Sequence, residues 1–117
     1  MTDEERQNIA TISEFFAAWN ERNASKVASF FAENARWSVG PIGKAPEFKS
    51  PNFTGLIEAA SHINLTVAPD SIWARGSVVA LELKDDIVLP DKKIGGTFVV
   101  IFTLVERKIV DFIEFFK

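Results

Sequence analysis

The stretch "GGTFVVIFTLVERKIVDFIEFF", residues 95–116, decides the fold because it reads as two long strands joined by a tight turn. Both apolar runs are rich in valine, isoleucine and phenylalanine, and the charged residues "ERK" separate them. A third alternating run, "SVVALELKDDIVL" at residues 77–89, precedes them and ends at the turn residues "PDKK". Three strands joined by short turns predict an antiparallel meander in the second half of the chain.

The beginning of the chain has the pattern of two helices. Thr2 and Glu5 form a capping-box signature for the first helix, which is predicted to run to about Asn20. Its buried face is expected to hold the apolar residues that follow a 3-4-3 spacing, namely Ile9, Ile12, Phe16 and Trp19. Asn23 is expected to cap a second, shorter helix, whose buried side holds Val27, Phe30 and Phe31.

The remaining segments complete an α+β arrangement. Residues 35–40, "ARWSVG", predict a short strand, and residues 54–63, "TGLIEAASHI", predict a third short helix. Helices segregated from an antiparallel sheet are typical of the α+β class. We therefore expect a single domain over residues 1–117, in which a curved, mostly antiparallel, cone-shaped sheet wraps around three N-terminal helices. The apolar interior of such a cone is a natural pocket for a small molecule.

Composition excludes several classes of function. The net charge is −3 without a lysine and arginine stripe, so neither nucleic acid nor an anionic membrane is expected as a partner. The chain has no cysteine and one histidine, and we expect no metal and no organic cofactor. No apolar run reaches the roughly 18 residues of a membrane span. The polar start "MTDEERQ" does not resemble a secretory signal, which predicts a cytoplasmic protein.

Two carboxylates occupy apolar strand faces and are the candidate catalytic groups. Strict alternation puts Glu114 on one face with Val110, Phe112 and Phe116, where an ionised acid is costly unless it is paired or its pKa rises. Asp85 is the one acid, near the end, of the otherwise apolar alternate set of the strand at residues 79–87, namely Val79, Leu81, Leu83, Asp85 and Ile87. Two acids beside an apolar cavity can divide acid and base roles in proton abstraction next to a carbonyl, aldol-type cyclisation or water activation.

Structural roles remain open for both acids. Asp85 would then only open the turn that follows its strand. Glu114 would extend toward the mouth of the cone or pair with Arg36 or Lys49.

Several stretches resemble the nuclear-transport-factor-2-like superfamily. Residues 15–37, "FFAAWNERNASKVASFFAENARW", resemble its opening helix pair and first strand, and "FTGLIEAA" at 53–60 is similar to the start of its third helix. Residues 76–83, "GSVVALEL", together with 95–116 resemble the closing strands of SnoaL-like and limonene-epoxide-hydrolase-like members. The resemblance implies the same cone-shaped fold, which hosts many unrelated activities.

The resemblance also implies how the known activities of the superfamily map onto this chain. The ketosteroid isomerase tyrosine falls at Phe15, and no carboxylate lies in the first strand at residues 37–39. The two acids of the limonene-epoxide-hydrolase-like members align with Asp85 and Glu114, whereas their bridging arginine falls at Leu83 and their tyrosine-x-asparagine at residues 37–39. A SnoaL-like cyclase or isomerase is therefore favoured, with epoxide-hydrolase-like activity as an alternative.

Aromatic and aliphatic side chains are expected to line the ligand site. The predicted walls are Trp37 and Trp73, together with Phe112, Phe116, Leu83, Val39 and Phe15. The predicted ligand is a small apolar molecule. A non-catalytic ligand carrier and a plain dimerisation module are the alternatives, and a general acid or base role for His62 also stays open.

The outer side of the last strand predicts a second subunit. The alternate residues Ile109, Asp111, Ile113 and Phe115 carry large apolar groups on the face opposite Glu114. A strand that is apolar on both faces is expected to be covered on both. A homodimer through the outer sheet face is the simplest cover, because two-fold dimers are the commonest closed assemblies.

Overall fold

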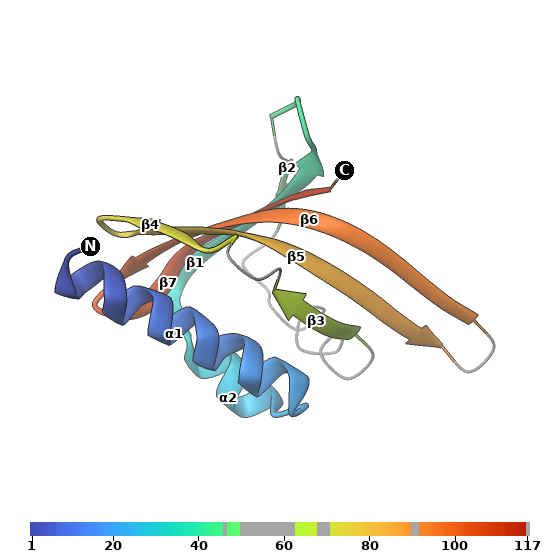
Figure 1. The fold of residues 1–117 in the computed structure, drawn as a ribbon, viewed down its shortest axis with the longest axis horizontal. Coiled ribbons are helices and arrows are strands. Elements are labelled where there is room, and N and C mark those ends of the chain that lie inside the picture. Colours follow the sequence, from blue (N-terminus) through green and yellow to red (C-terminus); the bar gives the residue numbers. More distant parts are fainter. Residues whose placement is uncertain (46, 50–62, 68–70, 90–91, 117) are drawn as a thin grey trace.

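The computed structural model describes residues 1–45, 47–49, 63–67, 71–89 and 92–116. Two helices, α1 (Asp3–Asn20) and α2 (Ala24–Ser29), lie on the inner side of one curved sheet (Figure 1). The seven strands of the sheet are β1 (Phe31–Pro41), β2 (Glu47–Lys49), β3 (Ile63–Val67), β4 (Trp73–Arg75), β5 (Val78–Leu89), β6 (Lys92–Val105) and β7 (Lys108–Phe116).

The sheet has the strand order β2-β1-β7-β6-β5-β3, and β4 also pairs with β5. Strands β5, β6 and β7 form the predicted antiparallel meander. The pair β1–β7 is parallel, so that the sheet is mixed although most of its pairs are antiparallel. The α+β, cone-shaped fold class is thus confirmed. The third helix predicted at 54–63 lies outside the described residues, except that Ile63 begins β3.

The start of α1 is held by reciprocal hydrogen bonds. The Thr2 hydroxyl accepts from the Glu5 N–H at 3.1 Å, and the Glu5 carboxylate accepts from the Thr2 N–H at 2.7 Å, which confirms the capping box. The second Glu5 oxygen accepts from the Gly76 N–H at 2.8 Å, in the turn between β4 and β5. Gly76 has φ +57°, a conformation that glycine adopts without steric cost. One side chain therefore caps the helix and anchors a turn of the sheet.

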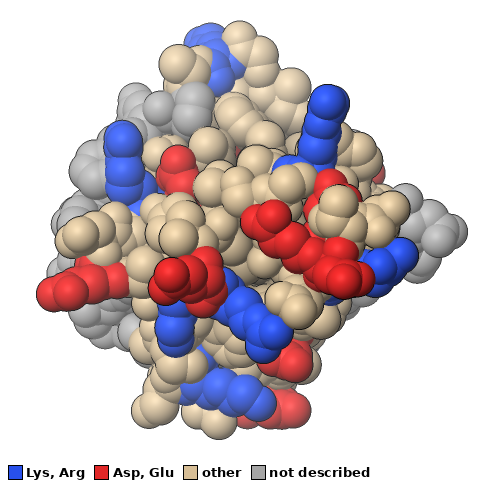
Figure 2. Space-filling view, turned by 90° about the vertical axis from the view of Figure 1, so that its left-hand side faces the viewer, with Lys and Arg blue, Asp and Glu red and all other residues tan. Residues whose placement is uncertain are grey.

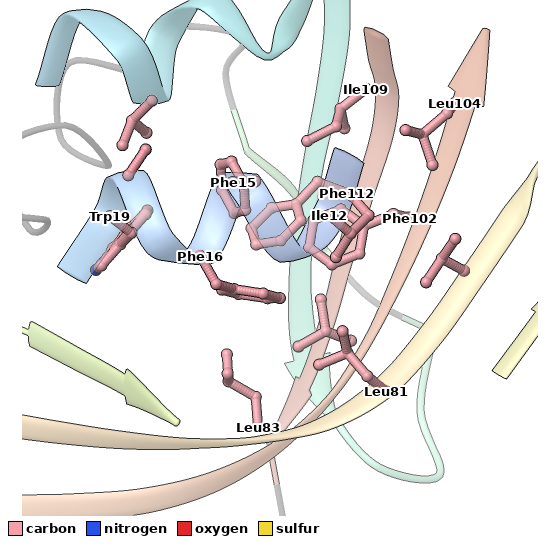
Figure 3. Close-up of a cluster of buried hydrophobic side chains, with 14 residues drawn as sticks. Ile12, Phe15, Phe16, Trp19, Leu81, Leu83, Phe102, Leu104, Ile109 and Phe112 are labelled. Atoms are coloured by element: carbon pink, nitrogen blue, oxygen red, sulfur yellow. The ribbon is translucent and has the colours of Figure 1, made fainter. Parts of the chain in front are cut away.

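The core consists of the aromatic face of α1 packed against the inner side of the sheet (Figure 3). Phe15 is completely buried at its centre, and its ring lies 5.3–6.3 Å from the rings of six aromatic residues, Phe16, Trp19, Phe30, Phe31, Phe102 and Phe112. Most of these pairs have the edge-to-face geometry that aromatic rings prefer. Phe31, predicted on α2, instead begins β1.

A β-bulge corrects the predicted alternation of β7. Ile109 pairs with Leu104, and Asp111 pairs with Thr103, so Val110 is an extra residue on β7. Such an insertion reverses which residues face inward on one side of the bulge. Ile109 is consequently buried in the core together with Phe112, although strict alternation placed it on the outer face. Only the part of β7 after Asp111 follows the predicted pattern.

The Glu5 hydrogen bonds predict a pH-dependent contribution to stability. The backbone N–H of Thr2, followed by that of Gly76, holds the pKa of the Glu5 carboxyl below its usual value of 4.5. A pKa that is lowered in the folded state stabilises the fold above the unfolded pKa, and this stabilisation disappears as the pH falls through the folded value. We expect Glu5→Gln to lower the melting temperature at pH 7. The difference from the parent should shrink as the pH falls below 4.5.

The control for this measurement is Glu4→Gln, which removes a neighbouring exposed charge from the same helical turn. Melting curves of the parent and both variants between pH 3 and pH 7 compare the two positions. Equal, pH-independent losses in both variants would contradict a specific role for Glu5.

The turn between β6 and β7 is predicted to store backbone strain. Glu106 and Arg107 have φ values of 50° and 65°, and a side chain at such a residue costs roughly 1–2 kcal/mol. We expect Arg107→Gly to be more stable than Arg107→Ala by about 1 kcal/mol in urea unfolding, because both variants lose the same charge and only glycine relieves the strain. Equal stability of the two variants would show that the turn is unstrained.

Candidate functional site

The candidate site lies where β1, β7 and β6 run side by side. The register pairs Trp37 with Phe112, Val39 with Glu114, and Glu114 with Val100. Paired residues of neighbouring strands point to the same side of a sheet, and both Phe112 and Val100 belong to the buried core. Trp37, Val39 and Glu114 therefore lie on the inner, concave side.

Glu114 lies at the edge of the apolar core. Its side chain is partly buried, and its cross-strand partner Val100 is fully buried. Phe112 and Phe116 precede and follow it on the same face. Arg36 is a possible ion partner of Glu114 in the sequence, but its side chain is exposed on the outer face. Its neighbour in the strand register of β7 is Asp111. The sheet thus holds Glu114, which has an interaction of its own, on the inner side beside the apolar residues Val100 and Phe112.

Asp85 lies farther along the sheet. The register pairs Asp85 with Gly96 on β6 and with Leu65 on β3. Gly96 lies four residues before Val100, which is the β6 partner of Glu114. From the ordinary rise and spacing of strands, the Cα atoms of Asp85 and Glu114 are about 15 Å apart. This distance exceeds the roughly 4–6 Å over which two carboxylates strongly perturb each other. The Asp85 side chain itself is outside the described part of the structure, as is the whole of His62.

Apart from Trp37 and Val39, which lie on the inner face, the predicted wall residues divide into three groups. Phe15, Leu83 and Phe112 are buried in the core and form its packed interior (Figure 3). Phe116 is 41% exposed at the end of β7, and its ring lies 6.4 Å from that of Phe98. Trp73 is 53% exposed and pairs with Ala80, whereas the neighbouring pair joins Ala74 to the core residue Val79. Trp73 therefore lies on the outer face of the sheet, away from Glu114.

The indole nitrogen of Trp37 is a feature that the sequence patterns did not indicate. Its Nε1–H is buried and has no hydrogen-bond partner among the residues that the structure describes. A buried donor without a partner costs roughly 1–3 kcal/mol, so most such groups in folded proteins are satisfied. Trp37 and Glu114 are diagonal neighbours across the β1–β7 pair, with Cα atoms about 7–8 Å apart. The inner face thus presents a donor and a carboxylate close together.

Other surfaces are less distinctive. Two open hollows of about 370 and 540 Å³ flank α1 beside the β6–β7 turn and share Gln7 and Arg107. At this end of the molecule acidic and basic side chains are interspersed (Figure 2), so its charge favours no single class of ligand. Among the described residues no group of histidine and acidic side chains is suited to hold a metal ion, and no helix is long and apolar enough to cross a membrane.

Comparison with known proteins identifies the family. The sequence model of the SnoaL-like domain matches residues 12–112. No curated protein matches the sequence. A similar solved structure is SalBIII, an epoxide hydrolase/cyclase-like enzyme in pyran ring formation in the polyether salinomycin. It is 22% identical, with a TM-score of 0.78, over 99% of this chain and 95% of that chain.

Two further structures have the same fold. An LEH-like epoxide hydrolase of M. tuberculosis is 15% identical, with a TM-score of 0.77, over 97% of this chain and 85% of that one. An NTF2-like protein of unknown function from Burkholderia pseudomallei is 19% identical, with a TM-score of 0.70, over 94% and 90% of the two chains. At these identities the likeness establishes the fold alone.

Proposed function

Because the chain belongs to the SnoaL-like domain family, we propose that it binds a small, largely apolar molecule in the cone and acts on it as a cyclase or isomerase. Glu114 is the acid and base of this reaction. The observation that carries the proposal is the position of Glu114, a partly buried carboxyl on the inner face beside the core residues Val100 and Phe112. Polar groups that converge on an apolar interior are typical of small-molecule sites.

The chemistry that suits one carboxylate is proton transfer at a carbon next to a carbonyl. The Glu114 carboxylate takes the proton, the electron pair of the C–H bond forms a C=C bond, and the carbonyl oxygen becomes an enolate. In an isomerase the neutral acid then returns the proton to another carbon. In an aldol-type cyclase the enolate carbon attacks a second carbonyl, and the proton goes to the new alkoxide.

Asp85 takes part only when the ligand is long. At about 15 Å from Glu114 it acts on a different part of the molecule, as a second acid or base. Epoxide hydrolysis is less suited to this chain, because Leu83, where the resembled hydrolases have an arginine, is buried in the core. A carrier without catalysis is the remaining alternative, and it differs from an enzyme in not needing the carboxyl group of Glu114.

Hydrogen exchange on a simple ketone tests the proposal without knowledge of the substrate. We expect the protein in D2O to accelerate deuterium incorporation next to the carbonyl of cyclohexanone, followed by NMR. Glu114→Gln should reduce the acceleration at least about 100-fold, as is usual when a general base is removed. The amide keeps the size of the side chain, so binding of the ketone, measured by its effect on the melting temperature, should persist.

Glu82→Gln is the matched control, because Glu82 alternates with the buried residues Leu81 and Leu83 and so lies on the opposite face of β5. It should leave the exchange unchanged. Binding without exchange in the parent protein would favour the carrier. Equal exchange in the parent and in Glu114→Gln would remove Glu114 from the mechanism, and absence of binding would reject the apolar site.

We also propose that the outer face of the sheet joins two copies of the chain. Apolar residues form two rows on this face. In one row, Ala80 of β5 pairs with Ile101 of β6, which pairs with Ile113 of β7. In the next row, Val99 of β6 pairs with Phe115 of β7. Charges of both signs, Arg36, Asp111, Glu82 and Lys84, lie in the neighbouring outer positions. A face that carries both signs around an apolar centre suits a two-fold interface, in which each patch meets its own copy.

Ile113→Lys is expected to convert a dimer into a monomer, because it places a charge at the apolar centre of this face. Analytical ultracentrifugation of the parent and the variant measures the change. Ile42→Lys is the control, since Ile42 is exposed but lies in the turn after β1. A monomeric parent, or loss of the dimer in both variants, would contradict the proposed interface.

A further inference from the structure

The buried indole N–H of Trp37 has no partner in the described part of the protein. We infer that it donates a hydrogen bond to the ligand, and that the ligand therefore carries a neutral carbonyl oxygen on an otherwise apolar framework. The inference rests on the proposed function, because it requires a molecule in the cone beside Glu114. It goes further in that it names the chemical group by which this molecule is held.

Among the described residues, the surroundings of Trp37 hold no acceptor for the indole N–H. On β1 the inner-face neighbours of Trp37 are Ala35, which is fully buried, and Val39, and neither has a side-chain acceptor. Its partner across β7 is Phe112, which has none either. The carbonyl groups of central strands accept hydrogen bonds within the sheet. The diagonal neighbour Glu114 has acceptor oxygens, yet no hydrogen bond joins it to the indole.

The chemistry of the two groups selects the kind of ligand. An indole N–H is a neutral donor that cannot accept a hydrogen bond, so it binds an oxygen with free lone pairs. A neutral acceptor is favoured over an anionic one, because the acidic side chain of Glu114, which has an interaction of its own, lies one diagonal position away. A ketone or aldehyde oxygen meets both conditions. The exposed ring of Phe116, on the same face as Glu114, suits the hydrocarbon part of the ligand.

The spacing of the two residues also fits a carbonyl compound. With Cα atoms about 7–8 Å apart, the side chains of Trp37 and Glu114 are close enough for one small ligand to contact both. A carbonyl oxygen at the indole N–H then leaves the adjacent carbon on the side of Glu114. The hydrogen bond positions the carbonyl group and polarises it. Trp37 is thus a binding residue of the site, in addition to the carboxylate.

Indole NMR tests this inference directly on the parent protein. The chain has three tryptophans, so 15N-tryptophan labelling gives three indole N–H signals, assigned by Trp19→Phe, Trp37→Phe and Trp73→Phe. Cyclohexanone and methylenecyclohexane are the probes, because they share one ring and only the ketone accepts a hydrogen bond. We expect both to bind, and the ketone alone to move the Trp37 N–H proton downfield. The Trp73 signal should not move, because Trp73 lies on the outer face.

Affinity measurements provide an independent test. Trp37→Phe should weaken cyclohexanone binding about tenfold, the loss expected for one neutral hydrogen bond, and should change methylenecyclohexane binding less than twofold. Trp19→Phe is the matched control, since it shortens another indole of the same core and should leave the preference for the ketone unchanged. If Trp37→Phe fails to fold, the NMR titration of the parent still decides.

The outcomes separate this inference from the proposed function. If both probes bind and the Trp37 signal stays in place, the carbonyl contact is wrong while the apolar site stands. A Trp37 proton that is already downfield without a probe and shows cross-peaks to water indicates a resident water as the partner, which also overturns the inference. If neither probe binds, both proposals fail together.

Discussion

The packing of one helical face against one curved sheet is the contact on which the rest of the structure depends. Phe15 lies at its centre and contacts aromatic residues of α1, β1, β6 and β7 as well as Phe30. Truncating a buried phenylalanine typically costs about 3–5 kcal/mol, a large part of the stability of a small domain. Because α1 fills this part of the concave side, the proposed ligand would lie toward the other end of the cone, near Val39 and Glu114. The packed core would then limit how deep the proposed site extends.

The second constraint ties the helix to the sheet at its first turn. Glu5 accepts hydrogen bonds from the helix start and from Gly76, and the Asn8 side-chain amide donates to the Gly76 carbonyl oxygen at 3.4 Å. Neither residue belongs to the apolar stripe, but together they fix the angle at which α1 crosses the strands. Packing supplies most of the stabilisation, whereas these polar contacts select one arrangement among several that would bury similar apolar area.

Periodicity predicted this fold well where strands are regular. On β5 the residues Val79, Leu81 and Leu83 are buried, as the alternation predicts, and the capping box of Thr2 is present. The same rule misplaced Ile109, because a bulge adds one residue at Val110 and nothing in the local pattern marks it. The positions of the tryptophans expected at the candidate site could not be predicted from periodicity. The outward position of Trp73 follows from its pairing in the hairpin, and the unpartnered nitrogen of Trp37 emerges only from the packed side chains around it.

The parallel pair of β1 and β7 has a consequence for how the chain reaches its structure. Strand β7 lies between β1 and β6, although it comes last in the sequence. The sheet therefore lacks one of its inner strands until residues 108–116 are available, even when all other strands have been made. During synthesis the edge of β1 has to wait for about 70 further residues, a long-range pairing of the kind that slows folding. Strand β1 lacks its inner partner throughout that interval, and β6 lacks the same partner from the time it is made. The sequence order of the strands, rather than the stability of the finished core, therefore determines when this protein is most vulnerable to aggregation.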